Sequence, residues 1–123
     1  MTPAWLRRAL LATAAMNILV GLAFASGSAS ILGAAGLPSG VDAFYTLTVG
    51  LFVLLFGLGY LGAAGAERPE RLFIALGGVG KLSFVALVAA LWMTGRLPAR
   101  APIAASPDLA FGLAFLAWSV GSR

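Results

Sequence analysis

The stretch from Leu72 to Thr94, LFIALGGVGKLSFVALVAALWMT, decides the fold class of this chain. Lys81 is its only charged residue, and the stretch exceeds the roughly 20 apolar residues that a helix needs to cross a bilayer. A central lysine costs about 2.5–3.5 kcal/mol on insertion, whereas each Leu, Ile, Val or Phe contributes about −0.3 to −0.6 kcal/mol. Eleven such residues lie in the stretch, so we predict a transmembrane helix that tolerates its lysine. A charge inside a membrane helix also makes Lys81 a candidate functional residue.

The composition of the whole chain is that of a membrane protein. Of its 123 residues, 61% are hydrophobic and 10% are charged, against about 45–50% and about 25% in soluble domains. The mean hydropathy is +1.01. The length allows one domain, residues 1–123. The eight Lys and Arg residues form no cluster that tracks phosphates, so we expect no nucleic-acid partner despite the net charge of +4.

Side chains for ordinary catalysis are scarce. The chain has no cysteine and no histidine, which excludes disulfides, thiol nucleophiles, imidazole bases and the usual transition-metal ligands. Its four carboxylates fall at no spacing that pairs two of them on one helix face deep in the membrane. We therefore expect a protein that is not an enzyme, with no catalytic residue, no metal site and no cofactor. The carboxylates are Asp42, Glu67, Glu70 and Asp108.

Four apolar segments, at about 5–25, 43–66, 72–94 and 107–121, predict an all-α fold, an antiparallel four-helix bundle in the membrane. The last segment is short. Ser106-Pro107-Asp108 is typical of a helix start, with the serine as N-cap and the aspartate in the first turn. A helix of about 15 residues spans only roughly 22 Å, less than the hydrocarbon core. Either residues 101–105 also enter the membrane, or the bilayer thins there.

The first segment also has features of a cleaved signal peptide. Arg7 and Arg8 precede an apolar stretch that ends in the small-residue pattern Ala23-Phe24-Ala25. However, that stretch has the length of a spanning helix rather than the roughly 7–15 residues of a signal peptide. We therefore expect it to be retained as a transmembrane helix.

Positive charges predict the orientation of the chain. Five lie at the two ends and in the connection 67–71, and two lie in the connection 95–106. The positive-inside rule therefore places both termini in the cytoplasm and loops 26–42 and 95–106 outside, in a bacterial inner membrane. The short connection 67–71 makes 43–66 and 72–94 antiparallel neighbours. The five charges are Arg7, Arg8, Arg68, Arg71 and Arg123, and the two are Arg96 and Arg100.

The first outer loop contains an apolar segment at 31–38, with the sequence ILGAAGLP. It suits a short segment lying in the membrane interface. A tight apolar connection packed on the end of the bundle fits equally well. Asp42, at the end of the same loop, is expected to cap the helix that begins at residue 43.

Polar residues at similar depth predict a cluster inside the bundle. At 1.5 Å per residue, Lys81 lies roughly 15 Å from Arg71, Asn17 roughly 13 Å from Arg8, and Tyr60 about 10 Å from the cytoplasmic edge. Asp108 is the only carboxylate within reach of the lysine. We predict that Lys81, Asp108, Asn17 and Tyr60 form a buried polar cluster or ligand-binding site.

Three interpretations of this cluster remain open. A buried Lys81–Asp108 ion pair would hold the helices in register. A site with Lys81 as counter-charge would bind a ligand. In the third, Lys81 is deprotonated, since removal from water disfavours the charged form.

Short motifs carry a resemblance to a known group of proteins. They are GLFVLLFGLGY at 50–60, LGGVGKLSF at 76–84, and Asp108-Leu109 early in a last helix that ends in Trp118. In these motifs and in layout the chain resembles small bacterial four-helix membrane proteins of the DoxX-like families. The resemblance implies a four-helix inner-membrane bundle in a bacterium, and it implies no reaction or substrate.

Two functions fit these features. The preferred one is a non-catalytic accessory or structural subunit of a membrane assembly, whose small-residue faces pack against other subunits or further copies of the chain. The alternative is a binder or carrier of a small anionic or lipid-like molecule, with Lys81 as counter-charge and Tyr60 and Asn17 as hydrogen-bonding groups. An enzyme that modifies a lipid or quinone is a distant third. The lipid bilayer is a partner in every case.

Overall fold

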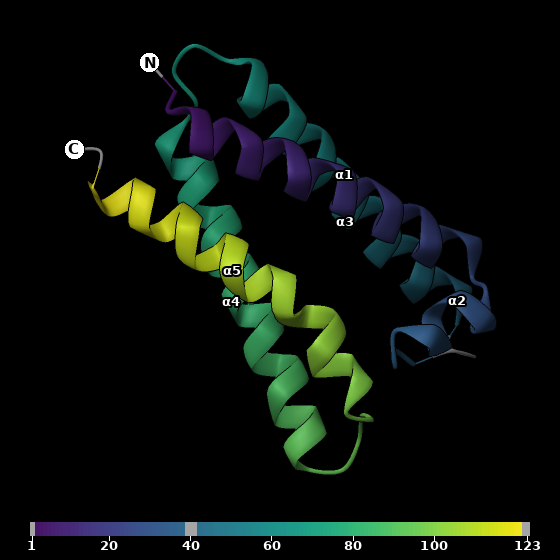
Figure 1. Cartoon of the computed structure of the whole chain (residues 1–123). Helices are drawn as coiled ribbons and strands as arrows, with labels where there is room; N and C mark the ends of the chain where they lie inside the picture. The colour runs from purple at the N-terminus through teal and green to yellow at the C-terminus, as the bar shows by residue number, and fades with distance from the viewer. Residues whose placement is uncertain (1, 39–41, 122–123) are drawn as a thin grey trace.

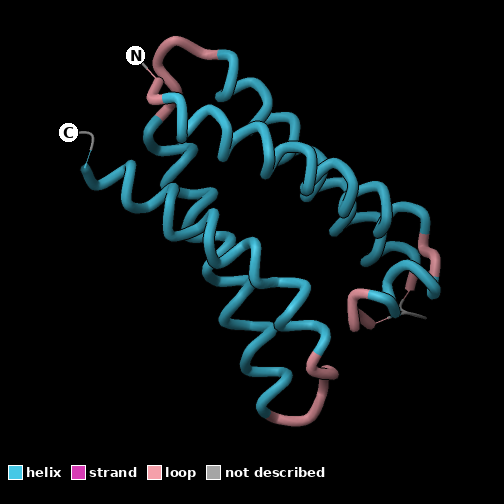
Figure 2. The backbone as a smooth tube through the Cα atoms, viewed as in Figure 1, coloured by secondary structure: helices cyan, strands magenta, loops and turns pink. Residues whose placement is uncertain are grey.

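The computed structural model describes residues 2–38 and 42–121, and this part of the chain contains helices and loops only (Figures 1 and 2). Four of its helices are long and apolar enough to cross a membrane, which indicates a small multi-pass membrane protein. Arg123, which entered the charge count, lies outside the described residues. The helices are α1 (Ala4–Ser26), α2 (Ala29–Ala34), α3 (Ala43–Gly65), α4 (Arg71–Met93) and α5 (Arg100–Gly121).

The long helices form two pairs, α1 with α3 and α4 with α5. Figure 1 shows the pairs meeting near the beginning of α1 and the end of α5, then spreading apart toward α2. Close packing of α3 along α4, expected from their short connection, is not found among the described residues. The two helices meet near that connection through aromatic rings, where the centroids of Tyr60 and Phe73 are 5.4 Å apart. Away from this aromatic contact, toward α2, the two pairs diverge (Figure 1).

Glycines bring the backbones together within each pair. A methyl group on Gly21 of α1 would lie 2.9 Å from the carbonyl oxygen of Gly50 in α3. In the second pair, a methyl group on Gly78 of α4 would lie 3.1 Å from the carbonyl oxygen of Gly112 in α5. Small residues are what membrane helices use for close approach. The small-residue faces predicted from the sequence therefore serve contacts inside this chain.

Helix α5 begins earlier than predicted. It starts at Arg100 and contains Pro107, so Ser106 is not an N-cap. Proline lacks the N–H that would bond to the carbonyl of Ile103 one turn back. The Ser106 hydroxyl donates to that same Ile103 oxygen at 2.7 Å, which supplies the missing donor and allows the helix to continue. With 22 residues α5 is about 33 Å long, enough to cross the hydrocarbon core.

The connection between α1 and α3 folds over the spreading end of the two pairs. Ser28 caps α2, and its Leu32 is buried. The Arg100 side chain donates from Nε to the carbonyl of Gly33 at 3.1 Å, which ties this connection to the start of α5. These contacts favour the tight-connection interpretation of residues 31–38 over the interfacial one. The predicted cap of α3 is confirmed, since the Asp42 carboxylate accepts from the Phe44 N–H at 2.9 Å.

The main core lies where the two pairs meet, and it takes side chains from all four long helices. A second, smaller cluster lies within the α4–α5 pair. Between the spreading halves, the described residues form no core shared by both pairs. The main core consists of Leu6, Leu10, Ala14, Tyr60, Ala64, Ile74 and Phe115.

Candidate functional site

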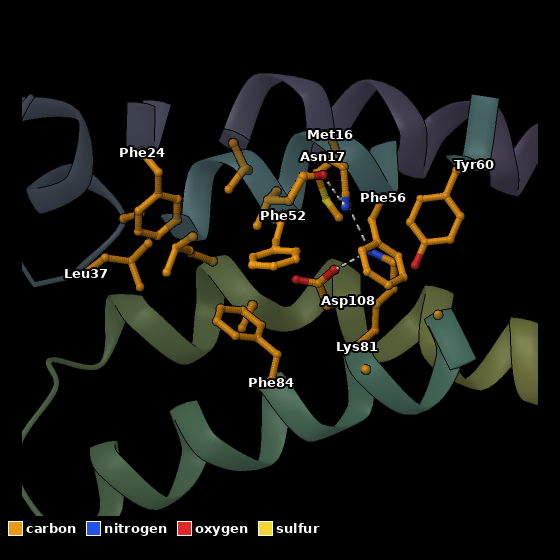
Figure 3. Close-up of a pocket in the computed structure, with 18 of the residues that line it drawn as sticks. Met16, Asn17, Phe24, Leu37, Phe52, Phe56, Tyr60, Lys81, Phe84 and Asp108 are labelled. Atoms are coloured by element: carbon orange, nitrogen blue, oxygen red, sulfur yellow. Dashed lines mark hydrogen bonds and ion pairs between the residues drawn. The ribbon is translucent and has the colours of Figure 1, made fainter. Parts of the chain in front are cut away.

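A pocket of about 370 Å³ lies between the two helix pairs, just beyond their shared core. All four long helices and the residues after α2 contribute to its walls. Figure 3 shows polar side chains gathered toward one end and apolar ones toward the other. The polar end holds Asn17, Tyr60, Lys81 and Asp108, and the apolar end holds Phe24, Leu37, Phe52 and Phe84.

Lys81 and Asp108 form an ion pair across the α4–α5 contact. Lys81 Nζ lies 2.7 Å from Asp108 Oδ1, and the two side chains are 7% and 16% exposed. Lys81 lies near the middle of α4. Asp108 lies one turn after Ala104 on α5, so both residues face the pocket. The structure thus brings Lys81 together with the only carboxylate that the sequence placed within its reach.

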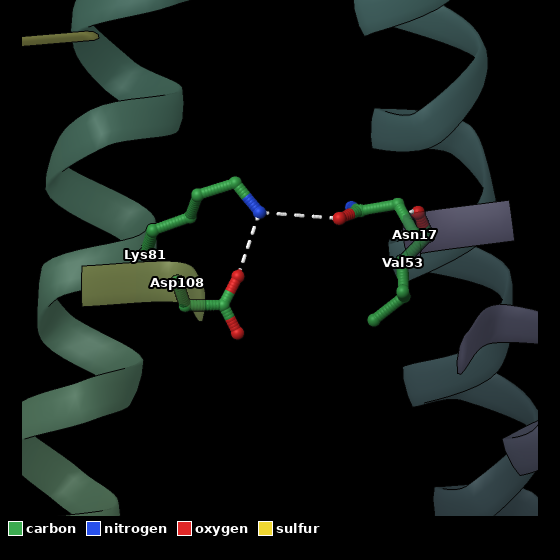
Figure 4. Close-up of polar contacts among 4 residues, drawn as sticks. All are labelled: Asn17, Val53, Lys81 and Asp108. Carbon is green, nitrogen blue, oxygen red and sulfur yellow. Dashed lines mark hydrogen bonds and ion pairs between the residues drawn. The ribbon is translucent and has the colours of Figure 1, made fainter. Parts of the chain in front are cut away.

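Asn17 connects this ion pair to the other helix pair (Figure 4). Its Oδ1 accepts a hydrogen bond from Lys81 Nζ at 3.2 Å, and its Nδ2 donates to the carbonyl of Val53 in α3 at 3.2 Å. The two bonds orient the amide, because its oxygen must face the lysine and its nitrogen the backbone of α3. Asn17 therefore holds a fixed position between α1, α3 and α4.

Tyr60 joins the cluster through its ring rather than its hydroxyl. Lys81 Nζ lies 5.4 Å from the centroid of the Tyr60 ring and 5.8 Å from that of Phe111, within cation–π range. The side chain of Tyr60 is only 2% exposed, and its hydroxyl packs against Gly77. Within residues 2–38 and 42–121 that hydroxyl has no hydrogen-bond partner. Lys81, in α4, thus touches side chains from α1, α3 and α5.

The polar end of the pocket has unused hydrogen-bonding capacity. Lys81 has three N–H donors, and the described residues accept only two of them. Asp108 Oδ2 receives no bond from any described residue, and Figure 4 shows it turned away from Lys81. Together with the Tyr60 hydroxyl, the pocket therefore offers one free acceptor and two free donors beside a neutralised charge pair.

The sequence did not single out the apolar wall of the pocket, because phenylalanines in membrane helices more often pack against other helices or contact lipid than line a ligand site. The spacing of the wall residues nevertheless indicated it. Phe52 and Phe56 precede Tyr60 at intervals of four residues, so they share its face of α3. Phe84 follows Lys81 by three residues, and Phe24 follows Asn17 by seven. Extending each helix face outward from its polar residue would have found the wall.

Neither similarity to known proteins nor a metal site identifies the function of this chain. Family models, curated proteins and solved structures gave no match to this chain. Within the described part of the chain, no three His, Cys, Asp or Glu side chains lie close enough to hold a metal ion. The DoxX-like resemblance stays a prediction, and the pocket is the feature of the structure that bears most directly on function.

We expect Gly77→Ala to destabilise the protein by about 1–3 kcal/mol, as overpacking of a filled site does. Its methyl group would lie 2.5 Å from the Tyr60 oxygen, and the ring is too confined by the core to move freely. Gly80→Ala is the matched control on the same helix, because no atom lies within 4 Å of its new methyl group. Denaturant titration in detergent measures both variants. Equal stabilities would contradict the tight contact.

Proposed function

We propose that this protein binds a small, largely apolar molecule in the pocket between its two helix pairs. The observation that carries the proposal is the pocket itself, about 370 Å³ with free polar groups at one end only. An apolar cavity of about 150 Å³ already holds benzene. Known ligand sites begin at about 300 Å³ and combine apolar walls with a few placed polar groups, as this pocket does.

Lipid-facing side chains support access from the bilayer. The wall residue Phe52 of α3 is 58% exposed and Phe84 of α4 is 38% exposed, so the pocket reaches the surface between these helices. The segment after α2 covers the end of the pocket, which leaves the sides as the route for a molecule dissolved in lipid. A carrier or receptor for membrane-dissolved molecules fits this arrangement.

The proposal includes the location and orientation of the chain. The excess of arginine near the beginning of α1 (Arg7 and Arg8) and around the start of α4 (Arg68 and Arg71) supports cytoplasmic termini in a bacterial inner membrane. In that orientation the polar end of the pocket lies near the middle of the bilayer, and the α2 end faces outward. Topology reporters fused at the two ends and at α2 measure this directly.

One observation favours a second, structural function. Lys81 contacts side chains from the three other long helices, so the cluster fastens the two pairs to each other. This fits an accessory subunit whose rigid shape matters to an assembly. The two functions are compatible, because the fastening bonds use only part of the polar capacity around the pocket.

Filling the pocket tests the binding function. We expect Gly80→Leu to weaken binding of naphthalene about tenfold or more, since a side chain added to a fitted site costs about 1–3 kcal/mol. Gly80 lines the pocket and has open space beside it. Equilibrium dialysis of radiolabelled naphthalene against the full chain in nanodiscs, with empty nanodiscs subtracted, gives the affinity.

Gly62→Leu is the matched control for this experiment. Gly62 also has open space where a side chain would stand, but it lies on α3 outside the pocket. The control should bind naphthalene as the unmodified chain does. Absence of saturable binding to the unmodified chain, or equal binding by both leucine variants, would refute the proposed function.

A further inference from the structure

We infer that the occupant of this pocket is a neutral ring compound bearing a hydroxyl group, bound with the hydroxyl at the Asp108–Lys81 pair, and that it is not an anion. The inference rests on the proposed function and names the class of its ligand. Of the small anionic or lipid-like molecule expected from the sequence, it keeps the apolar character and leaves out the negative charge.

The charges at the polar end of the pocket favour a neutral ligand. The positive charge of Lys81 lies 2.7 Å from a carboxylate oxygen, so the polar end carries a neutral pair rather than a free cation. An anionic ligand would have to approach the second oxygen of Asp108, which is also negative, in a medium where like charges repel strongly. A cationic ligand meets the same difficulty at Lys81. A neutral ligand avoids both.

The free hydrogen-bonding groups at the polar end favour a ligand hydroxyl. Asp108 Oδ2 can only accept, whereas the third N–H of Lys81 can only donate. A ligand hydroxyl donates to the carboxylate and accepts from Lys81, so it satisfies both kinds of group. A ketone or ether would leave the carboxylate oxygen unmatched, which costs binding free energy.

The walls and volume of the pocket favour a flat ring system. Figure 3 shows the rings of Phe52 and Phe84 between the polar cluster and Leu37, with the ring of Phe24 beside Leu37. Flat ring systems pack well against aromatic side chains. The volume of about 370 Å³ is more than twice the roughly 150 Å³ that holds benzene, so two fused rings fit.

The direction of the pocket separates its occupant from an ordinary phospholipid. The polar end lies near the middle of α4, roughly 15 Å from its first residue at 1.5 Å per residue. A phospholipid carries its charged headgroup at the membrane surface and its chains at the centre. The pocket requires the opposite order, with a single uncharged polar group deep in the membrane.

Four naphthalene probes test the inference with the full chain in nanodiscs. They are naphthalene, 2-naphthol, 2-methoxynaphthalene and 2-naphthoate, which differ only in one substituent. Equilibrium dialysis at pH 7, corrected with empty nanodiscs and the Gly80→Leu variant, gives each affinity. We expect 2-naphthol to bind about three- to tenfold more tightly than naphthalene or the methoxy compound, the worth of one hydrogen bond, and naphthoate to bind least.

Each other result has a distinct meaning. Tightest binding by naphthoate would overturn the neutral class, and equal binding by naphthol and the methoxy compound would overturn the need for a donor. In both cases the proposed function would stand. Absence of saturable binding by all four probes would remove the proposed function together with this inference.

Discussion

Asp108→Leu is expected to lower the free energy of unfolding by about 3–5 kcal/mol, the usual cost of leaving one buried charge without its partner. Lys81 is 7% exposed and has no second carboxylate in contact among the described residues. Within the described part of the chain, only Asn17 would remain as its acceptor. Denaturant titration of the full chain in detergent measures the loss. Glu67→Leu, which removes an exposed carboxylate, should change stability by less than about 0.5 kcal/mol.

The double variant Lys81→Met/Asp108→Leu distinguishes an unpaired charge from lost packing. Replacing a buried ion pair by apolar side chains of similar volume is often neutral, so most of the stability lost in Asp108→Leu should return. A double variant as unstable as the single one would show that the ion pair does not account for the effect. The pair would then not be what fastens α4 to α5 at this depth.

Gly21→Leu is expected to destabilise the protein by at least about 3 kcal/mol, at the upper end of what overpacking costs. Even a single methyl group at this position would lie 2.9 Å from the backbone of Gly50 and of Leu54. Backbone atoms of a packed helix cannot move aside as a side chain can. The leucine must therefore push α1 away from α3, which also strains the bond from Asn17 to Val53.

Gly62→Leu serves as the control for this variant too, because it makes the same chemical change on α3 where no atom lies within 4 Å. It should keep the stability of the unmodified chain or exceed it slightly, since leucine favours a helix over glycine by up to about 1 kcal/mol. Similar stabilities of the two leucine variants in denaturant titration would show that Gly21 and Gly50 do not set the α1–α3 contact.

The members of the candidate site were predictable from the sequence because depth along a helix is predictable. Lys81 is the only charge in its apolar segment, Asp108 is the only carboxylate within its reach, and Asn17 lies at a matching depth. The rise of 1.5 Å per residue carries that information with no knowledge of packing. Tyr60 was placed in the same group, but its part as a ring beneath the lysine was not predictable from depth.

The start of α5 could not be predicted from the local sequence. Proline after serine favours a helix start in most contexts, and nothing in the sequence separates a serine that caps from one that donates backward. The backward bond from Ser106 to Ile103 forms because residues 100–105 are already helical, with Ala101 and Ala105 buried against α4. Packing between segments distant in sequence made that choice.

The sequence by itself determined the membrane class, the four spanning segments and the residues of the polar cluster, because hydropathy and depth are properties of each helix alone. Only the tertiary structure decided that α1 pairs with α3, that α4 pairs with α5, and that a pocket opens between the pairs. In lipid an apolar face gains little by choosing one apolar neighbour over another. The choice falls to shape, since Gly21 meets Gly50 in one pair and Gly78 meets Gly112 in the other. Such fits exist only between helices that are already side by side.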